Sequence, residues 1–295
     1  MQSADFLSAV FFYLKVGENL NQNWIVENLN NAFSTWNGKL GELWGLVTTG
    51  PQAFKGGAVW SVMQTLHNGM VGIGYALVVL FFAISLCKNT MNFHELKRPE
   101  AAIHYFLRFV AAKALVGYGM DIMLNAFSIC NGIVTDMADS MGGISEAMVS
   151  LPAEMQTAIE NVGFLASIPL WLVTILGSLF ITVLSFVMIL TVYGRFFRLY
   201  MYTALAPLPL AAFAGESTQS VGISFLKSYV GVCLEGAVIV LACVIYSAFV
   251  STPTVASGEA TTIVWSYLAE TVFNMLVLVG LIKGSDRIIH EMMGL

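Results

Sequence analysis

Long apolar runs separated by short polar segments dominate the hydrophobic pattern of this chain. The longest run carries no charge for 33 residues, from Val162 to Gly194. As an α-helix, its last 26 residues, Pro169 to Gly194, would be about 39 Å long, against ~30 Å for the hydrocarbon core of a bilayer. We therefore predict a tilted transmembrane helix over this stretch.

A second apolar run follows and contains two prolines. It covers the 16 residues from Leu199 to Ala214, with Pro207 and Pro209 inside it. A transmembrane helix needs about 20 residues, and each proline removes a backbone donor where lipid offers no replacement. We predict a broken, re-entrant segment that packs among other helices.

Two arginines, Arg195 and Arg198, separate these apolar runs. Their spacing of three residues places them on one face of a helix. Arginine side chains at the end of a membrane helix can reach lipid phosphate groups or water. We expect this pair to anchor the helix end at the headgroups.

Four further apolar runs predict four more spans, at about 68–87, 101–131, 228–250 and 263–282. Three glycines, Gly69, Gly72 and Gly74, lie in the first of them. Glycines leave a helix without side-chain bulk and permit the close approach of a neighbouring helix. Together with the central helix, the pattern predicts five spans.

The region before the first span has a different, amphipathic pattern. Apolar residues recur there at steps of three and four, which predicts a helix of about six turns ending before Gly50 and Pro51. They are Ile25, Leu29, Phe33, Trp36, Leu40, Leu43, Trp44 and Val47. This stripe packs either on the membrane surface or spans, or on a partner or neighbouring subunit. We expect three parts: an extracytoplasmic amphipathic region (1–56), a transmembrane domain (57–283) and a short cytoplasmic tail (284–295).

Composition supports a membrane environment and argues against several classes of function. Hydrophobic residues make up 57% and charged residues 11% of the chain, and the mean hydropathy is +0.77. These values indicate an all-α integral membrane protein. A net charge of −5 argues against a broadly basic nucleic-acid surface. Since nucleotide-binding and zinc-protease motifs are absent, we expect no catalytic site, metal or cofactor.

Four ionisable residues lie inside the predicted spans: Lys113, Asp121, Glu235 and Glu270. An unpaired charge at the bilayer centre costs ~2.5–3.5 kcal/mol or more, so these side chains should face protein or water. One interpretation is pairing between helices, with Lys113 as the cation for the acids. The other is the polar lining of a conduit or a proton path. The sequence leaves both open.

The distribution of basic residues predicts the orientation in the membrane. If the double-proline segment enters and leaves the membrane on the same side, the chain has five spans. Eight basic residues then lie in the cytoplasm, and the two loops that contain no lysine or arginine lie outside. The amino terminus is then outside and the carboxyl terminus inside. The cytoplasmic residues are Lys88, Lys97, Arg98, Arg195, Arg198, Lys227, Lys283 and Arg287.

The stretch from Tyr193 to Phe213, YGRFFRLYMYTALAPLPLAAF, resembles the TrbL-type polytopic proteins of conjugative type IV secretion systems, particularly those of Gram-positive mobile elements. The order of parts over roughly 60–290 is similar as well. In this resemblance Arg195, Arg198, Pro207 and Pro209 have structural or lipid-contacting roles.

The resemblance implies a subunit of the bacterial plasma membrane that assembles as a homo-oligomeric ring. Such a subunit would contribute to the path of DNA or protein through the secretion machine, beside other subunits and separate ATPases. The alternative function is a small-solute transporter or permease subunit, although such proteins usually show paired broken helices. A third hypothesis is an intramembrane enzyme, but the sequence shows no pair of catalytic residues that would support it.

Overall fold

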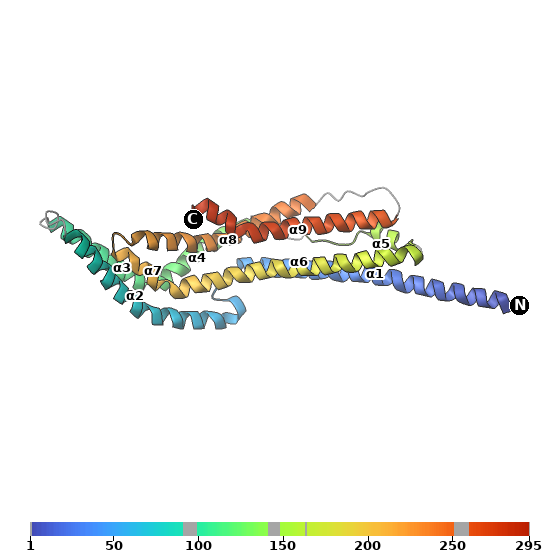
Figure 1. Cartoon of the computed structure of the whole chain (residues 1–295), viewed down its shortest axis with the longest axis horizontal. Coiled ribbons are helices and arrows are strands. Elements are labelled where there is room, and N and C mark those ends of the chain that lie inside the picture. The colour runs from blue at the N-terminus through green and yellow to red at the C-terminus, as the bar shows by residue number, and fades with distance from the viewer. Residues whose placement is uncertain (1, 91–98, 141–147, 163, 251–259, 295) are drawn as a thin grey trace. The chain divides into compact units, whose positions relative to one another are not determined.

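The computed structural model describes residues 2–90, 99–140, 148–162, 164–250 and 260–294 (Figure 1). Within these ranges the chain is helical apart from short turns and one extended stretch before Ala153, and it contains no β-strand. The predicted all-α fold is confirmed. The helices are α1 (Gln2–Thr48), α2 (Ala58–Thr90), α3 (Pro99–Gly117), α4 (Gly119–Ser140), α5 (Ala153–Glu160), α6 (Phe164–Leu205), α7 (Pro207–Ala211), α8 (Gln219–Val250) and α9 (Ala260–Met293).

The chain forms two compact units. The first comprises Met1–Gly45, Met141–Thr191 and Leu241–Lys283, and the second comprises Leu46–Ser140, Val192–Val240 and Gly284–Leu295. Helices α1, α6, α8 and α9 each contribute residues to both units. The second unit contains the double-proline segment and both arginines that follow the charge-free run.

Four helical segments of the described ranges are long and apolar enough to cross a membrane. They are Phe54–Lys88, Ile168–Leu205, Gln219–Phe249 and Thr262–Met293. They cover four of the five predicted spans, and the chain is a membrane protein. The orientation of its termini stays a prediction.

The predicted span at 101–131 is wrong as one continuous helix. Helix α3 ends at Gly117 and α4 begins at Gly119, so the helix is interrupted at Tyr118 between two glycines. A Cβ on Gly119 would lie 3.1 Å from Leu210 Cδ1 and 3.4 Å from His67 Cε1. A side chain at this position would crowd Leu210, so glycine suits the packing here. Hydrophobicity alone did not reveal the interruption.

Helix α6 is longer than the predicted span. It passes through Gly194 and both arginines and ends at Leu205, two residues before Pro207. Proline lacks the N–H of the helical ladder and restricts the residue before it, which explains where the helix ends. The 42 residues of α6 extend about 63 Å, roughly twice the hydrocarbon thickness of a bilayer. Part of α6 must therefore lie beyond the hydrocarbon core, or the helix must be strongly tilted.

The amphipathic stripe of α1 is buried within the protein. Seven of its eight predicted residues are buried, and Trp44 is partly exposed. In the first unit, Trp24 stacks on Trp171 of α6 with ring centroids 5.6 Å apart. Asn37 also holds the backbone of Val149, with its Nδ2 donating to the carbonyl at 2.8 Å and its Oδ1 accepting from the N–H at 2.9 Å. The structure therefore favours packing on the chain's own helices over docking of a partner.

The double-proline segment breaks the helix as predicted and packs on α2 and α3 in the second unit. Among the three glycines of α2, only Gly74 is at a close contact. A Cβ there would lie 2.9 Å from the carbonyl oxygen of Pro207 and 2.9 Å from Val116 Cγ1, whereas Gly69 and Gly72 have no neighbouring atom within 4 Å. Close approach is thus confirmed for one glycine of the three.

Replacing Gly74 with alanine should lower the thermal unfolding midpoint of the detergent-purified protein, followed by tryptophan fluorescence. The added methyl group would overpack the contact with Pro207, at a typical cost of ~1–3 kcal/mol. Gly72→Ala is the matched control, because its methyl group meets open space and alanine favours a helix. Equal midpoints for the two variants would contradict the close contact.

Candidate functional site

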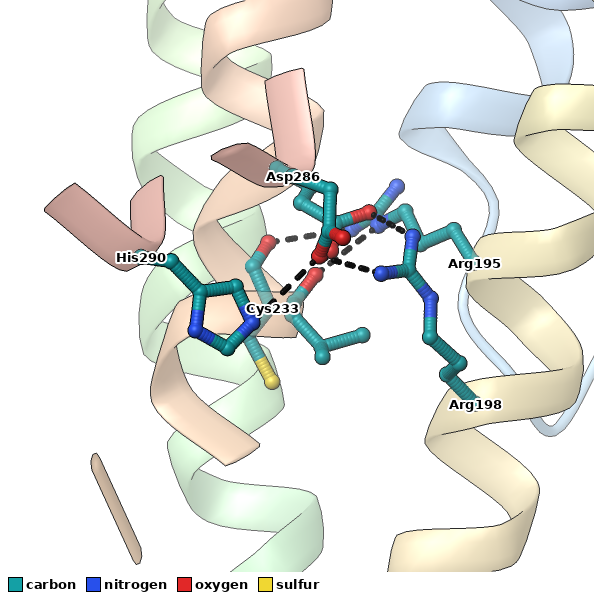
Figure 2. Close-up of polar contacts among 7 residues, drawn as sticks. Arg195, Arg198, Cys233, Asp286 and His290 are labelled. Carbon is teal, nitrogen blue, oxygen red and sulfur yellow. Dashed lines mark hydrogen bonds and ion pairs between the residues drawn. The ribbon is translucent and has the colours of Figure 1, made fainter. Parts of the chain in front are cut away.

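Arg195 and Arg198 lie one turn apart on α6 and form the centre of a polar junction in the second unit (Figure 2). Most of their partners come from α8 and from the last turns of α9. This cluster joins residues of three of the four candidate spans. It is therefore the strongest candidate site of the described chain.

Arg195 is a buried cation that bonds to backbone carbonyl groups. Its side chain is 1% exposed. Nε donates to the carbonyl oxygen of Val232 at 3.2 Å, and Nη2 donates to that of Cys233 at 3.1 Å. Nη1 makes a long contact of 3.5 Å to the carbonyl oxygen of Val47. Since a buried charge without partners is costly, these carbonyl groups are what permits Arg195 to lie inside the protein.

A glycine on α8 makes room for this guanidinium group. A Cβ on Gly236 would lie 2.9 Å from both Nη1 and Nη2 of Arg195. On another side, the guanidinium carbon lies 5.8 Å from the centroid of the Phe127 ring, which is a cation–π geometry. Arg195 is thus enclosed by α8 backbone and by an aromatic ring of α4.

Arg198 binds two carboxylate groups at once. Nη2 donates to Glu235 Oε2 at 2.7 Å, and Nη1 donates to Asp286 Oδ1. The Glu235 side chain is 2% exposed, whereas that of Asp286 is 45% exposed. His290 Nε2 lies 3.5 Å from Asp286 Oδ1, one turn further along α9 (Figure 2). The guanidinium group of Arg198 therefore ties α6 to both α8 and α9.

The expected headgroup anchor is wrong for Arg195, because its side chain is buried among protein groups. The sequence argument assumed that the charges mark the membrane boundary, whereas the protein supplies carbonyl partners inside. Arg198 is 29% exposed, and both of its bonds described above are to carboxylates of the chain. A headgroup contact of Arg198 stays a prediction.

The four ionisable residues predicted inside spans have different environments. Glu235 is buried, and its cation is Arg198 and not Lys113. The side chains of Lys113, Asp121 and Glu270 are exposed on the surface of the described chain. Pairing between helices is confirmed for Glu235, and the proposed pairing of Lys113 with Glu235 is wrong.

Gly236 and Asp286 belong to the site and were not singled out from the sequence. Asp286 lies beyond the last apolar run, where it was assigned to the short cytoplasmic tail. Gly236 directly follows the one acid of its span, and a glycine beside a buried charge is a signal that could have indicated a close side-chain contact. In the part of the chain that the structure describes, no three histidine, cysteine or acidic residues are grouped to hold a metal ion.

Comparison with known protein families identifies one match over more than half of the chain. Residues 36–207 match the family described as TrbL/VirB6 plasmid conjugal transfer like protein. The matched region includes Arg195, Arg198 and Pro207, and it ends before α8. Comparisons with curated proteins and with solved structures find no match.

Arg195→Lys should destabilise the protein by about 1–3 kcal/mol in denaturant or thermal unfolding. Lysine keeps the charge, but its single ammonium group cannot reproduce the fork that bonds the carbonyl groups of Val232 and Cys233. The matched control is Arg287→Lys, because the Arg287 side chain is 85% exposed and pairs with Glu291 on the surface. A similar loss of stability in both variants would argue against a specific role for the Arg195 fork.

Proposed function

Because the chain belongs to the TrbL/VirB6 plasmid conjugal transfer family, we propose that it is a channel or scaffold subunit of a conjugative type IV secretion machine. In this role it contributes to the path of DNA or protein across the cytoplasmic membrane. The observation that carries the proposal is the family match, which covers the two candidate spans Phe54–Lys88 and Ile168–Leu205 completely.

The helices offer apolar surface for lipid or for neighbouring subunits. In the apolar window of α2 only 17% of the residues are buried within the chain, the smallest share among the four candidate spans. Exposed apolar side chains also line α6, including Leu172, Leu179 and Leu190. A subunit that packs among copies of itself and other membrane components has a use for such faces. This supports a homo-oligomeric ring.

The chain acts without catalysing a reaction in this proposal. Its sequence has no P-loop, so energy comes from separate ATPases of the machine, which are partners of the ring. The distribution of basic residues supports an extracytoplasmic amino terminus and a cytoplasmic carboxyl terminus in the bacterial plasma membrane.

A donor strain that lacks this chain should lose conjugative transfer and recover it on complementation. Formaldehyde crosslinking during mating, followed by immunoprecipitation, should recover the transferred DNA strand with the complementing chain. The matched control is a donor without the coupling ATPase, in which the chain is present and no DNA should be recovered. Normal transfer without the chain would refute the proposal, and transfer that needs the chain without DNA recovery would restrict it to a scaffold.

Protein purified into lipid nanodiscs should form closed homo-oligomers by mass photometry and electron microscopy. The Pro207→Ala, Pro209→Ala double variant should reduce their yield, because Pro207 is buried against α2 at Gly74. Gly72→Ala, which meets no neighbouring atom within 4 Å, serves as the control. A strict monomer with saturable binding of a small solute would favour the permease alternative.

A further inference from the structure

Glu235 carries a carboxylate oxygen that the junction leaves without a donor. The side chain is 2% exposed, and Oε2 accepts from Arg198 at 2.7 Å. Oε1 is buried and has no hydrogen-bond partner among the described residues. Leaving a buried charged acceptor unsatisfied is expensive. The role of the protein in transfer does not account for this arrangement.

The carboxyl groups of Asp286 and Glu235 lie side by side, because one guanidinium group binds both. Arg198 donates to Asp286 through Nη1 (Figure 2) and to Glu235 through Nη2. Two ionised carboxylates can only accept hydrogen bonds. A hydrogen bond between these two groups therefore requires that one of them carries a proton. A shared proton also removes the repulsion between two like charges at one site.

Other charged or titratable groups lie around the pair. From α6, Arg198 is shared between the two acids, and Arg195 directs its Nε and Nη2 at the carbonyl groups of Val232 and Cys233. From α8 and α4, the thiols of Cys233 and Cys130 lie beside Arg195. From α9, His290 contacts Asp286 from its outer side. The guanidinium group of Arg198 is therefore the direct ion-pair partner of both Glu235 and Asp286.

Solvent exposure of the side chains decreases from His290 and Asp286 to Glu235. The side chains of His290 and Asp286 are each 45% exposed, and they lie 3.5 Å apart. Glu235, next to Asp286, is almost completely buried. Asp286 and His290 thus form an accessible end, and Glu235 forms a protected end, of one series of titratable groups.

We propose that Glu235 and Asp286 together form a proton-binding site that exchanges with solvent through Asp286 and His290. The proton belongs to the pair and not to one residue. Its loss places two negative charges in contact between α8 and the last turns of α9, with Arg198 as their common cation. The site depends only on contacts in the second unit and is independent of the proposed role in transfer.

Infrared difference spectroscopy of the full chain in lipid nanodiscs tests this site directly. At neutral pH the wild type should show a C=O band of a protonated carboxylic acid that shifts in heavy water and disappears at high pH. Glu235→Gln should lose this band, because the amide keeps the shape and binds no proton there. Asp286→Asn should also lose it, because Glu235 then has Arg198 to itself and ionises.

The control is Glu154→Gln, an exposed acid of α5 outside the candidate spans, which should retain the band. Size-exclusion chromatography establishes that each variant is folded, and Asp286→Asn carries the test if Glu235→Gln does not fold. A band of equal strength in the wild type and both pair variants would overturn the proposal. The proposal would also be overturned if the folded wild type showed no protonated-carboxyl band that disappears in these variants.

Discussion

The charge of Arg195 must be compensated inside the protein, and the second unit is arranged around this requirement. A guanidinium group cannot lose its charge at any physiological pH, so it needs acceptors wherever it lies. Here the acceptors are carbonyl groups of α8, and Gly236 leaves room beside them for the guanidinium group. Arg198, one turn further, adds carboxylates from α8 and α9. The crossing of α6 with its neighbours is therefore specified by hydrogen bonds, which is more selective than contact between apolar faces.

This specificity matters in a chain that is mostly apolar. Between membrane helices the hydrophobic effect provides little preference for one neighbour over another, because lipid tails are as apolar as leucine. Directional hydrogen bonds from two arginines favour the observed packing of α6, α8 and α9 over arrangements in which the helices are shifted along one another. Tight backbone contacts, such as that between Gly74 and Pro207, fix a second point of the same unit.

Much of the fold could be predicted from the sequence because its signals are local. Charge-free runs indicate spans, prolines end α6, and the three- and four-residue steps of α1 mark its buried stripe. The partners of the arginines could not be predicted, since backbone carbonyl groups carry no sequence signature and Asp286 is 88 residues from Arg198. The interruption at Tyr118 was also missed, because hydrophobicity does not reveal it. Long-range contacts decide which groups the arginines bind.

The contact between Gly236 and the Arg195 guanidinium restricts how this region of the chain can change during evolution. A Cβ at position 236 would lie 2.9 Å from both Nη1 and Nη2 of Arg195, so a larger residue there must displace the guanidinium group from its carbonyl partners. Loss of the arginine in turn leaves an open space beside α8 that a larger residue at 236 can fill. The two positions are therefore expected to covary among descendants of this sequence.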